Sequence, residues 1–323
     1  MYVILSSGFL LPKSQTMAEA STFLANKRYA VVTGSNKGIG FEICRQLAST
    51  GVTVVLTARD EKRGLQAARE LQNNTSLSGG AVVFHQLDVA DPASVSSLVG
   101  FVATQFGRLD ILVNNAGING VIMDGNAMSK AVERAGGEFP HGEEVWKEIS
   151  TEDYGIAEEC VKTNYYGAKS VTEALLPLLH LSDSPRIVNV SSALGTLEFI
   201  PGEWPKQVLG DIETLTEERV DQVLESFLQD FKEGDFGKRG WPTHISAYKV
   251  SKAALNAYTR IMAKKLPSFL VNSVCPGFVQ TDITCSTGLF TPPQGAESPV
   301  WLALLPQGGP SGLFFHRKQV SSF

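Results

Sequence analysis

Apolar residues along the chain alternate between short continuous runs and stretches with helical spacing. The continuous runs are rich in β-branched residues and lack two-residue alternation, which is typical of strands buried on both faces. The pattern predicts strands at 29–33, 52–58, 81–89, 109–117, 186–192 and 269–277. It predicts helices between them at 39–50, 60–72, 92–107, 160–179 and 247–266. We therefore expect an α/β fold with a doubly wound parallel sheet, formed as a single domain over residues 27–323.

Two stretches interrupt this alternation, at about 119–156 and 193–246. Both are far longer than the roughly half-dozen residues of an ordinary connection. The second contains an apolar stripe at helical spacing that ends at Gly234, and Thr214 with Glu217 fits a capping box before it. This predicted helix can either pack on the core or act as a lid over a substrate, and the sequence leaves both interpretations open.

Composition and charge narrow the class of protein. The chain has 323 residues, is 43% hydrophobic and carries a formal net charge of −5, so no basic surface for nucleic acid or a membrane is expected. The four cysteines form no C-x-x-C pair and the five histidines are scattered, which predicts reduced thiols, no metal site and a cytoplasmic location. Residues 1–26 are expected to form a flexible arm, because their apolar stretch is too short to span a membrane and no basic residue precedes it.

Glycine-rich and polar positions follow the predicted strands, at the edge of the sheet where α/β folds bind ligands. Directly after the first strand come Gly34, Gly38 and Gly40. This is not the G-x-G-x-x-G spacing, but these glycines let the backbone turn and approach a pyrophosphate at a helix N-terminus. The sequence therefore predicts a nucleotide-binding site after the first strand.

The end of the second strand distinguishes the two nicotinamide cofactors. An acidic residue there would bind the ribose 2′-hydroxyl of NAD, but this strand ends in Arg59, and Lys37 lies in the glycine loop. Two cations suit the 2′-phosphate of NADP(H), whereas Asp60 could turn inward and favour NAD. The competing interpretation is that both cations are solvated surface charges. Asp88, after the third strand, is placed to accept a hydrogen bond from the adenine amino group.

Tyr248 and Lys252 stand one helical turn apart at the start of the last predicted helix. A lysine this close favours the phenolate and lowers the tyrosine pKa from about 10, which suits a proton donor to a carbonyl oxygen. Ser192 can hydrogen-bond the same oxygen, and Ser191 is its rival because the two point to opposite sides of the strand. Asn164 could hold a water that passes protons to Lys252. The competing interpretation is two residues on one face of an ordinary helix.

Together these motifs resemble the short-chain dehydrogenase/reductase family. The matching pieces are 33–40, 114–117, Asn164, 190–192, Tyr248 with Lys252, and 276–277. The resemblance covers roughly residues 27–316. It implies a Rossmann-like fold, catalysis by Tyr248, Lys252, Ser192 and Asn164, a carboxamide site at Val279 and Thr281, and a sheet-bracing Asn115. The residues expected to bind NADPH are Gly34, Asn36, Lys37, Gly38, Ile39, Gly40, Arg59, Asp88, Val89, Asn115, Lys252, Val279 and Thr281.

A closer resemblance, carried by residues 27–48, 183–192 and 310–315, is to plant carbonyl reductases of the salutaridine reductase and menthone/neomenthol reductase type. It implies NADPH-dependent reduction of a small hydrophobic ketone or aldehyde, such as a terpenoid or alkaloid. It also implies a monomer, because the insertion before Tyr248 covers the helix face through which other members associate. The alternatives are a C=C reductase of the same family, of a kind that lacks the tyrosine, and a cofactor-binding regulatory protein without turnover.

Overall fold

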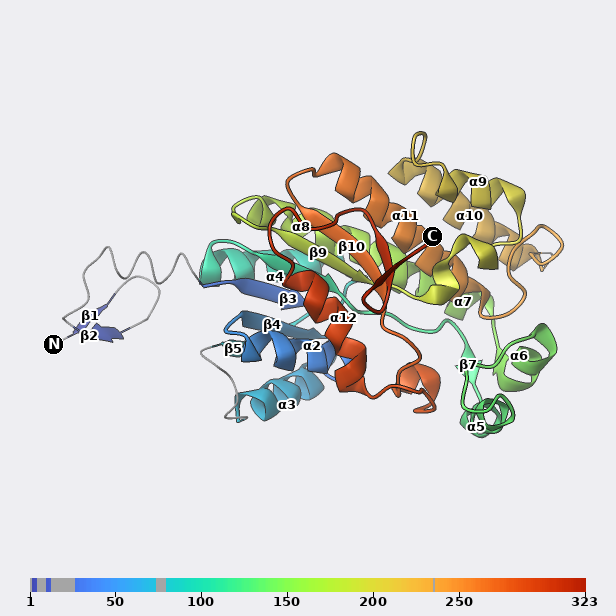
Figure 1. Cartoon of the computed structure of the whole chain (residues 1–323), viewed down its shortest axis with the longest axis horizontal. Helices are drawn as coiled ribbons and strands as arrows, with labels where there is room; N and C mark the ends of the chain where they lie inside the picture. The colour runs from blue at the N-terminus through green and yellow to red at the C-terminus, as the bar shows by residue number, and fades with distance from the viewer. Residues whose placement is uncertain (1, 5–9, 13–26, 74–79, 235) are drawn as a thin grey trace.

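The computed structural model describes residues 2–4, 10–12, 27–73, 80–234 and 236–323. At its centre is an eight-stranded sheet with the order β12-β11-β10-β9-β6-β3-β4-β5 (Figure 1). All neighbours are parallel except β11 and β12, which confirms the predicted α/β fold with a doubly wound, mostly parallel sheet. The strands are β3 (Tyr29–Val32), β4 (Thr53–Ala58), β5 (Ala81–Gln86), β6 (Ile111–Asn114), β9 (Arg186–Val190), β10 (Leu270–Cys275), β11 (Phe314–His316) and β12 (Gln319–Ser321).

Helices cover both faces of this sheet, because successive residues of a strand point to opposite sides. Val31 and Leu112 belong to the core on one face, and Val32 and Val113 belong to the core on the other. The helices that share the first core are α4 (Pro92–Phe106), α8 (Ala168–Leu179) and α11 (Ser246–Lys265). Those that share the second are α2 (Gly38–Ser49), α3 (Glu61–Gln72) and α12 (Pro292–Ala303).

The six predicted strands all form, but the pattern gave no indication of α12, β11 or β12. β11 and β12 contain three residues each, which is too short for a periodic signal. For α12 a local signal does exist apart from the apolar pattern, since Thr291 and Gln294 form a capping box at its start. The helix expected from Cys160 begins earlier, as α7 (Tyr154–Val161), and continues through a π-helical turn, η1 (Lys162–Gly167), into α8.

The first insertion, which contains the helices α5 (Gly125–Arg134) and α6 (Glu143–Ile149), extends beyond one end of the sheet (Figure 1). Its side chains form a third apolar cluster, which includes Trp146 and Ile149 and also reaches Ile245 before α11. Its elements are β7 (Ile122–Met123), α5 (Gly125–Arg134), α6 (Glu143–Ile149) and β8 (Ser150–Thr151), before α7 begins.

The second insertion supplies the predicted apolar helix, α10 (Glu217–Glu233), together with α9 (Glu203–Gly210) and the short helices η2 (Ala193–Gly195) and η3 (Leu197–Phe199). α10 buries Val223 and Phe227 in the same core as α7 and α11, so packing on the core is the interpretation that the structure supports. The predicted capping box at Thr214 is wrong. The helix starts two residues later, where Oγ1 of Thr216 accepts the Arg219 N–H at 3.3 Å.

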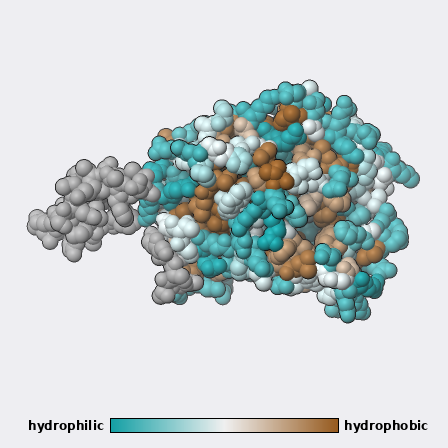
Figure 2. All heavy atoms as spheres, in the orientation of Figure 1, coloured by the Kyte–Doolittle hydropathy of each residue, from teal (hydrophilic) through white to brown (hydrophobic). Residues whose placement is uncertain are grey.

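The expected N-terminal arm is described only at β1 (Tyr2–Ile4) and β2 (Leu10–Pro12), which pair antiparallel and do not join the main sheet. The rest of the arm, 1, 5–9 and 13–26, lies outside the described residues. Within the described ranges, no helix is both long and apolar enough to cross a membrane, and no three potential metal ligands gather. All four cysteines are free thiols. On the face drawn in Figure 2, hydrophobic residues form separate patches between hydrophilic ones.

Candidate functional site

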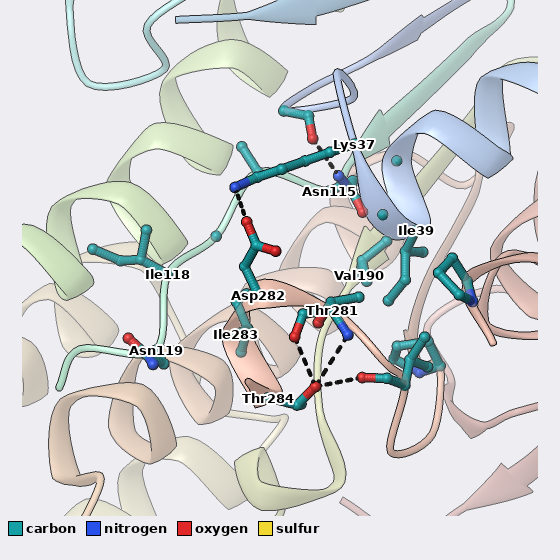
Figure 3. Close-up of a pocket in the computed structure, with 18 of the residues that line it drawn as sticks. Lys37, Ile39, Asn115, Ile118, Asn119, Val190, Thr281, Asp282, Ile283 and Thr284 are labelled. Atoms are coloured by element: carbon teal, nitrogen blue, oxygen red, sulfur yellow. Dashed lines mark hydrogen bonds and ion pairs between the residues drawn. The ribbon is translucent and has the colours of Figure 1, made fainter. Parts of the chain in front are cut away.

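A cavity of about 650 Å³ opens at the carboxyl ends of the parallel strands. Its wall comes from the glycine loop after β3, the residues that follow β4, β5, β6 and β9, the start of α11 and the segment after β10. Figure 3 labels residues of the glycine loop, of the segments after β6 and β10, and Val190 at the end of β9. Parallel strands bring these distant segments together at one edge of the sheet. The predicted residues that line the cavity are Gly34, Asn36, Lys37, Gly38, Ile39, Gly40, Arg59, Val89, Asn115, Ser192, Tyr248, Lys252, Val279 and Thr281.

Three glycines of the loop, Gly34, Gly38 and Gly40, bring backbone without side chains to the cavity. Gly34 and Gly38 have φ values of 60° and 56°, in the left-handed region that glycine adopts without strain. A Cβ on Gly34 would lie 2.8 Å from Cα of Ala116, and one on Gly40 would lie 2.5 Å from Nδ2 of Asn115. The Asn115 amide donates to the Gly34 carbonyl at 3.0 Å, which ties the loop to the end of β6. The loop and the N-terminus of α2 therefore form a cradle that suits a pyrophosphate.

Cationic side chains from the glycine loop and the end of β4 line the same cavity. Lys37 reaches across it to form an ion pair with Asp282 (Figure 3). Arg59 lies 3.5 Å from the Glu159 carboxylate. All four side chains are more than half exposed, so these pairs are weak and an incoming phosphate can replace either carboxylate.

Arg63 is a cavity residue that the sequence pattern did not reveal. The available signal was a cation in the first turn of the helix after β4. The Arg63 N–H donates to Oδ1 of Asp60 at 2.9 Å, and the guanidinium lies 3.8 Å from the same carboxylate. Asp60, the residue that could have favoured NAD, is thus occupied as the N-cap of α3 and faces a positive charge.

Tyr248 and Ser192 meet in the cavity wall. The Ser192 hydroxyl shares a hydrogen bond with the Tyr248 side chain, and its oxygen accepts the Leu194 N–H at 3.1 Å. Ser191 also lines the cavity, but its hydroxyl donates to the backbone carbonyl of Lys252 at 3.3 Å. Of the two neighbouring serines, Ser192 is therefore the one that interacts with the tyrosine.

The Lys252 ammonium is buried beside Tyr248. Its Nζ donates to the Val190 carbonyl at 2.8 Å and lies 5.7 Å from the centre of the Tyr248 ring. Burial lowers the pKa of Lys252 to about 8. Burial also raises the pKa of Tyr248, and the hydrogen bond with Ser192 offsets only part of that rise. The lowered tyrosine pKa expected from the sequence is therefore wrong for this structure, because loss of hydration outweighs the hydrogen bond with Ser192.

Two predicted site residues do not line the cavity. Asn164 is buried in η1, where Oδ1 accepts the Ile118 N–H at 2.8 Å and Nδ2 donates to the Ile118 carbonyl at 2.9 Å. A Cβ on Gly117 would lie 3.2 Å from Oδ1 of Asn164 and 3.4 Å from Nζ of Lys252, so both atoms lie close to this glycine. Asp88 uses Oδ1 to accept the N–H two residues later at 2.9 Å, and its adenine contact stays a prediction.

Comparison with known proteins identifies the family. A family model described as short chain dehydrogenase matches residues 28–202. The chain is 59% identical over 297 residues to (+)-neomenthol dehydrogenase of Arabidopsis thaliana, an alignment that covers 92% of this chain and 98% of that protein. It is 57% identical over 307 residues to short-chain dehydrogenase/reductase 1 of Saponaria officinalis, covering 95% and 100%. The structure of salutaridine reductase from Papaver somniferum matches with a TM-score of 0.82 and 51% identity, over 89% of this chain and 99% of that one. The chain therefore belongs to the short-chain dehydrogenase/reductase family of oxidoreductases.

Proposed function

We propose that this protein is an NADPH-dependent carbonyl reductase. The observation that carries the proposal is the meeting of Tyr248, Ser192 and Lys252 with the glycine loop in one cavity. The loop offers bare backbone for a pyrophosphate, and the side chains of Lys37, Arg59 and Arg63 offer positive charge for a 2′-phosphate. The names of the relatives, neomenthol dehydrogenase and salutaridine reductase, support a small hydrophobic ketone or aldehyde, such as a terpenoid or alkaloid, as the substrate.

In the proposed reaction, the substrate carbonyl oxygen lies between Ser192 and Tyr248. NADPH, when held by the glycine loop and the cationic side chains beside it, would supply the hydride for the carbonyl carbon. Because the Ser192 oxygen already accepts the Leu194 N–H, its own proton can be donated to the carbonyl oxygen and hold it in place. Tyr248, whose raised pKa keeps it protonated, transfers its proton to that oxygen as negative charge develops there. Lys252 stabilises the remaining phenolate, and a water beside Asn164 returns a proton to the pair.

Three further parts of the proposal are the hydrophobic character of the substrate, the monomeric state of the protein and its cytoplasmic location. Ile118 and Ile283 line the cavity and give it apolar wall near the catalytic residues, which suits a hydrophobic substrate. A monomer is proposed because α10 already covers α7 and α11 with its apolar side, and because the face in Figure 2 shows apolar patches that are small and separate. A cytoplasmic location is proposed because all four cysteines are free thiols.

The pH dependence of kcat/KM for NADPH should report the buried ammonium of Lys252. Its pKa is about 8, so the charge that attracts the cofactor is present below that pH and is lost as pH rises through it. Tyr248 has a raised pKa and does not limit the rate in this range. We expect a constant value at neutral pH and a decline above about pH 8, measured by initial rates. A basic limb that persists unchanged in Lys252→Met would contradict this assignment.

Arg59→Ala should reduce the preference for NADPH over NADH, taken as the ratio of their kcat/KM values, roughly tenfold or more. The variant removes a charge-assisted hydrogen bond to the 2′-phosphate, and breaking the exposed pair with Glu159 costs little. Arg69→Ala, on the exposed side of α3, is the matched control and should leave the ratio unchanged. An unchanged ratio in Arg59→Ala would mean that this guanidinium does not reach the cofactor.

The function itself is tested by NADPH consumption with cyclic terpenoid ketones, alkaloid ketones and small aldehydes, with identification of each product. An alcohol as the product supports carbonyl reduction. Loss of the C=C bond of an enone, with the ketone retained, would establish the alternative reductase. Tight NADPH binding without turnover on any compound would establish a regulatory role instead.

A further inference from the structure

Helix α11, which carries Tyr248, begins without a cap from its own residues. The residue at its N-terminus, Ile245, has φ 40° and ψ 42°, a left-handed conformation that is strained for a β-branched side chain. Isoleucine also has no side-chain acceptor for the N–H groups of the first helical turn. These groups need a hydrogen-bond partner from another part of the chain.

Glu152, between β8 and α7, is that partner. Its Oε1 and Oε2 each accept the Ser246 N–H at 3.0 Å, and the Ser246 hydroxyl donates to Oε2. The Ala247 N–H adds a further hydrogen bond to the same carboxylate. A negative charge at this position is also stabilised by the positive end of the helix dipole. Glu152 therefore caps α11 from 94 residues earlier in the sequence.

The first insertion packs against the same turn of α11. Ile245 is buried in one apolar cluster with Val121, Trp146 and Ile149 of the insertion, and Tyr248 packs on that cluster. The carboxylate and the cluster thus fix the start of α11 from two sides, one polar and one apolar. Tyr248 stands in the helical turn that these two contacts hold.

We propose that Glu152 is a positioning residue for Tyr248, which holds the first turn of α11 and the first insertion in one arrangement. Glu152 does not line the cavity, so it acts through the helix and not on the substrate. This inference rests on the proposed function, in which Tyr248 transfers the proton. A displacement of the donor by about 1 Å lowers turnover up to roughly 100-fold.

The test compares Glu152→Gln and Glu152→Ala with the control Glu148→Gln, which removes an exposed carboxylate of the same insertion. Gln keeps one acceptor oxygen and Ala keeps none, so we expect kcat to fall roughly tenfold and roughly 100-fold. The Kd for NADPH should stay within about twofold in all three variants, because neither carboxylate lines the cavity. Amide hydrogen exchange across residues 246–248 should be faster in both Glu152 variants and unchanged in the control.

The pH profile of kcat separates positioning from a general loss of stability. Burial raises the pKa of Glu152, and the hydrogen bonds from Ser246 offset only part of that rise. The other titratable groups around it are Lys249 on α11, which attracts the carboxylate, Cys160 on α7, and His244, which contacts Lys249. The ionised carboxylate is the better acceptor, so the cap is intact above the raised pKa and is weakened as pH falls through it. The parent should show an acid limb that is absent in Glu152→Gln.

Parental kcat in both Glu152 variants, or unchanged hydrogen exchange at the start of α11, would overturn the inference. The exchange measurement uses the protein without substrate or cofactor. If the parent reduces no ketone, the proposed function fails, while faster exchange that extends to Tyr248 in the Glu152 variants still supports the positioning role.

Discussion

Tyr248→Phe is expected to lower kcat for ketone reduction roughly 10³-fold, while the Kd for NADPH stays within about twofold. The substitution removes only the hydroxyl that shares a hydrogen bond with Ser192 and keeps the ring that packs on the first insertion. Ser192 can still hydrogen-bond the carbonyl oxygen in this variant, but the proton that Tyr248 transfers in the proposed reaction is lost. Single-turnover kinetics with pre-bound NADPH measure the chemical step directly.

The matched control for this prediction is Tyr258→Phe. Tyr258 is a fully buried tyrosine on the same helix α11, and it does not line the cavity. Burial raises its pKa as it raises that of Tyr248, but Tyr248 is partly exposed where it lines the cavity and Tyr258 lies within the core. Turnover should be retained in Tyr258→Phe. Near-normal turnover in Tyr248→Phe would show that another group supplies the proton.

Lys252→Met should lower kcat/KM roughly 100-fold or more and weaken NADPH binding about tenfold. Methionine keeps most of the buried volume of the lysine stem, so the packing of α11 changes little. What disappears is the ammonium that donates to the Val190 carbonyl and stands beside the Tyr248 ring. Fluorescence titration gives the Kd for NADPH, and initial rates give kcat/KM.

Lys249→Met provides the comparison for Lys252→Met. Both lysines are buried on α11, and burial lowers the pKa of each to about 8. Lys249 faces His244 and the ring of Phe199 and does not line the cavity, so its loss should leave the Kd for NADPH unchanged. Equal losses of NADPH affinity in the two variants would count against a direct role for Lys252 in cofactor binding.

Most residues of the site could be predicted from the order of strands and motifs along the chain. Parallel strands place their carboxyl ends at one edge, so Gly34, Arg59, Asn115 and Ser192 had to meet once the strands were recognised. Arg63 and Glu152 did not follow in this way. Arg63 reaches the cavity from inside a helix, and Glu152 meets α11 through an insertion that has no periodic signal.

The sequence by itself determined the doubly wound sheet, because six apolar strands alternating with helices can be buried on both faces only in that arrangement. It also determined where the candidate chemistry lies, since each motif follows a strand. Only the tertiary structure decided which serine faces Tyr248, how α11 is capped, and that burial raises the pKa of Tyr248 while lowering that of Lys252. The hydration and the long-range hydrogen bonds of a side chain depend on what packs around it in three dimensions. A local sequence pattern does not specify these surroundings.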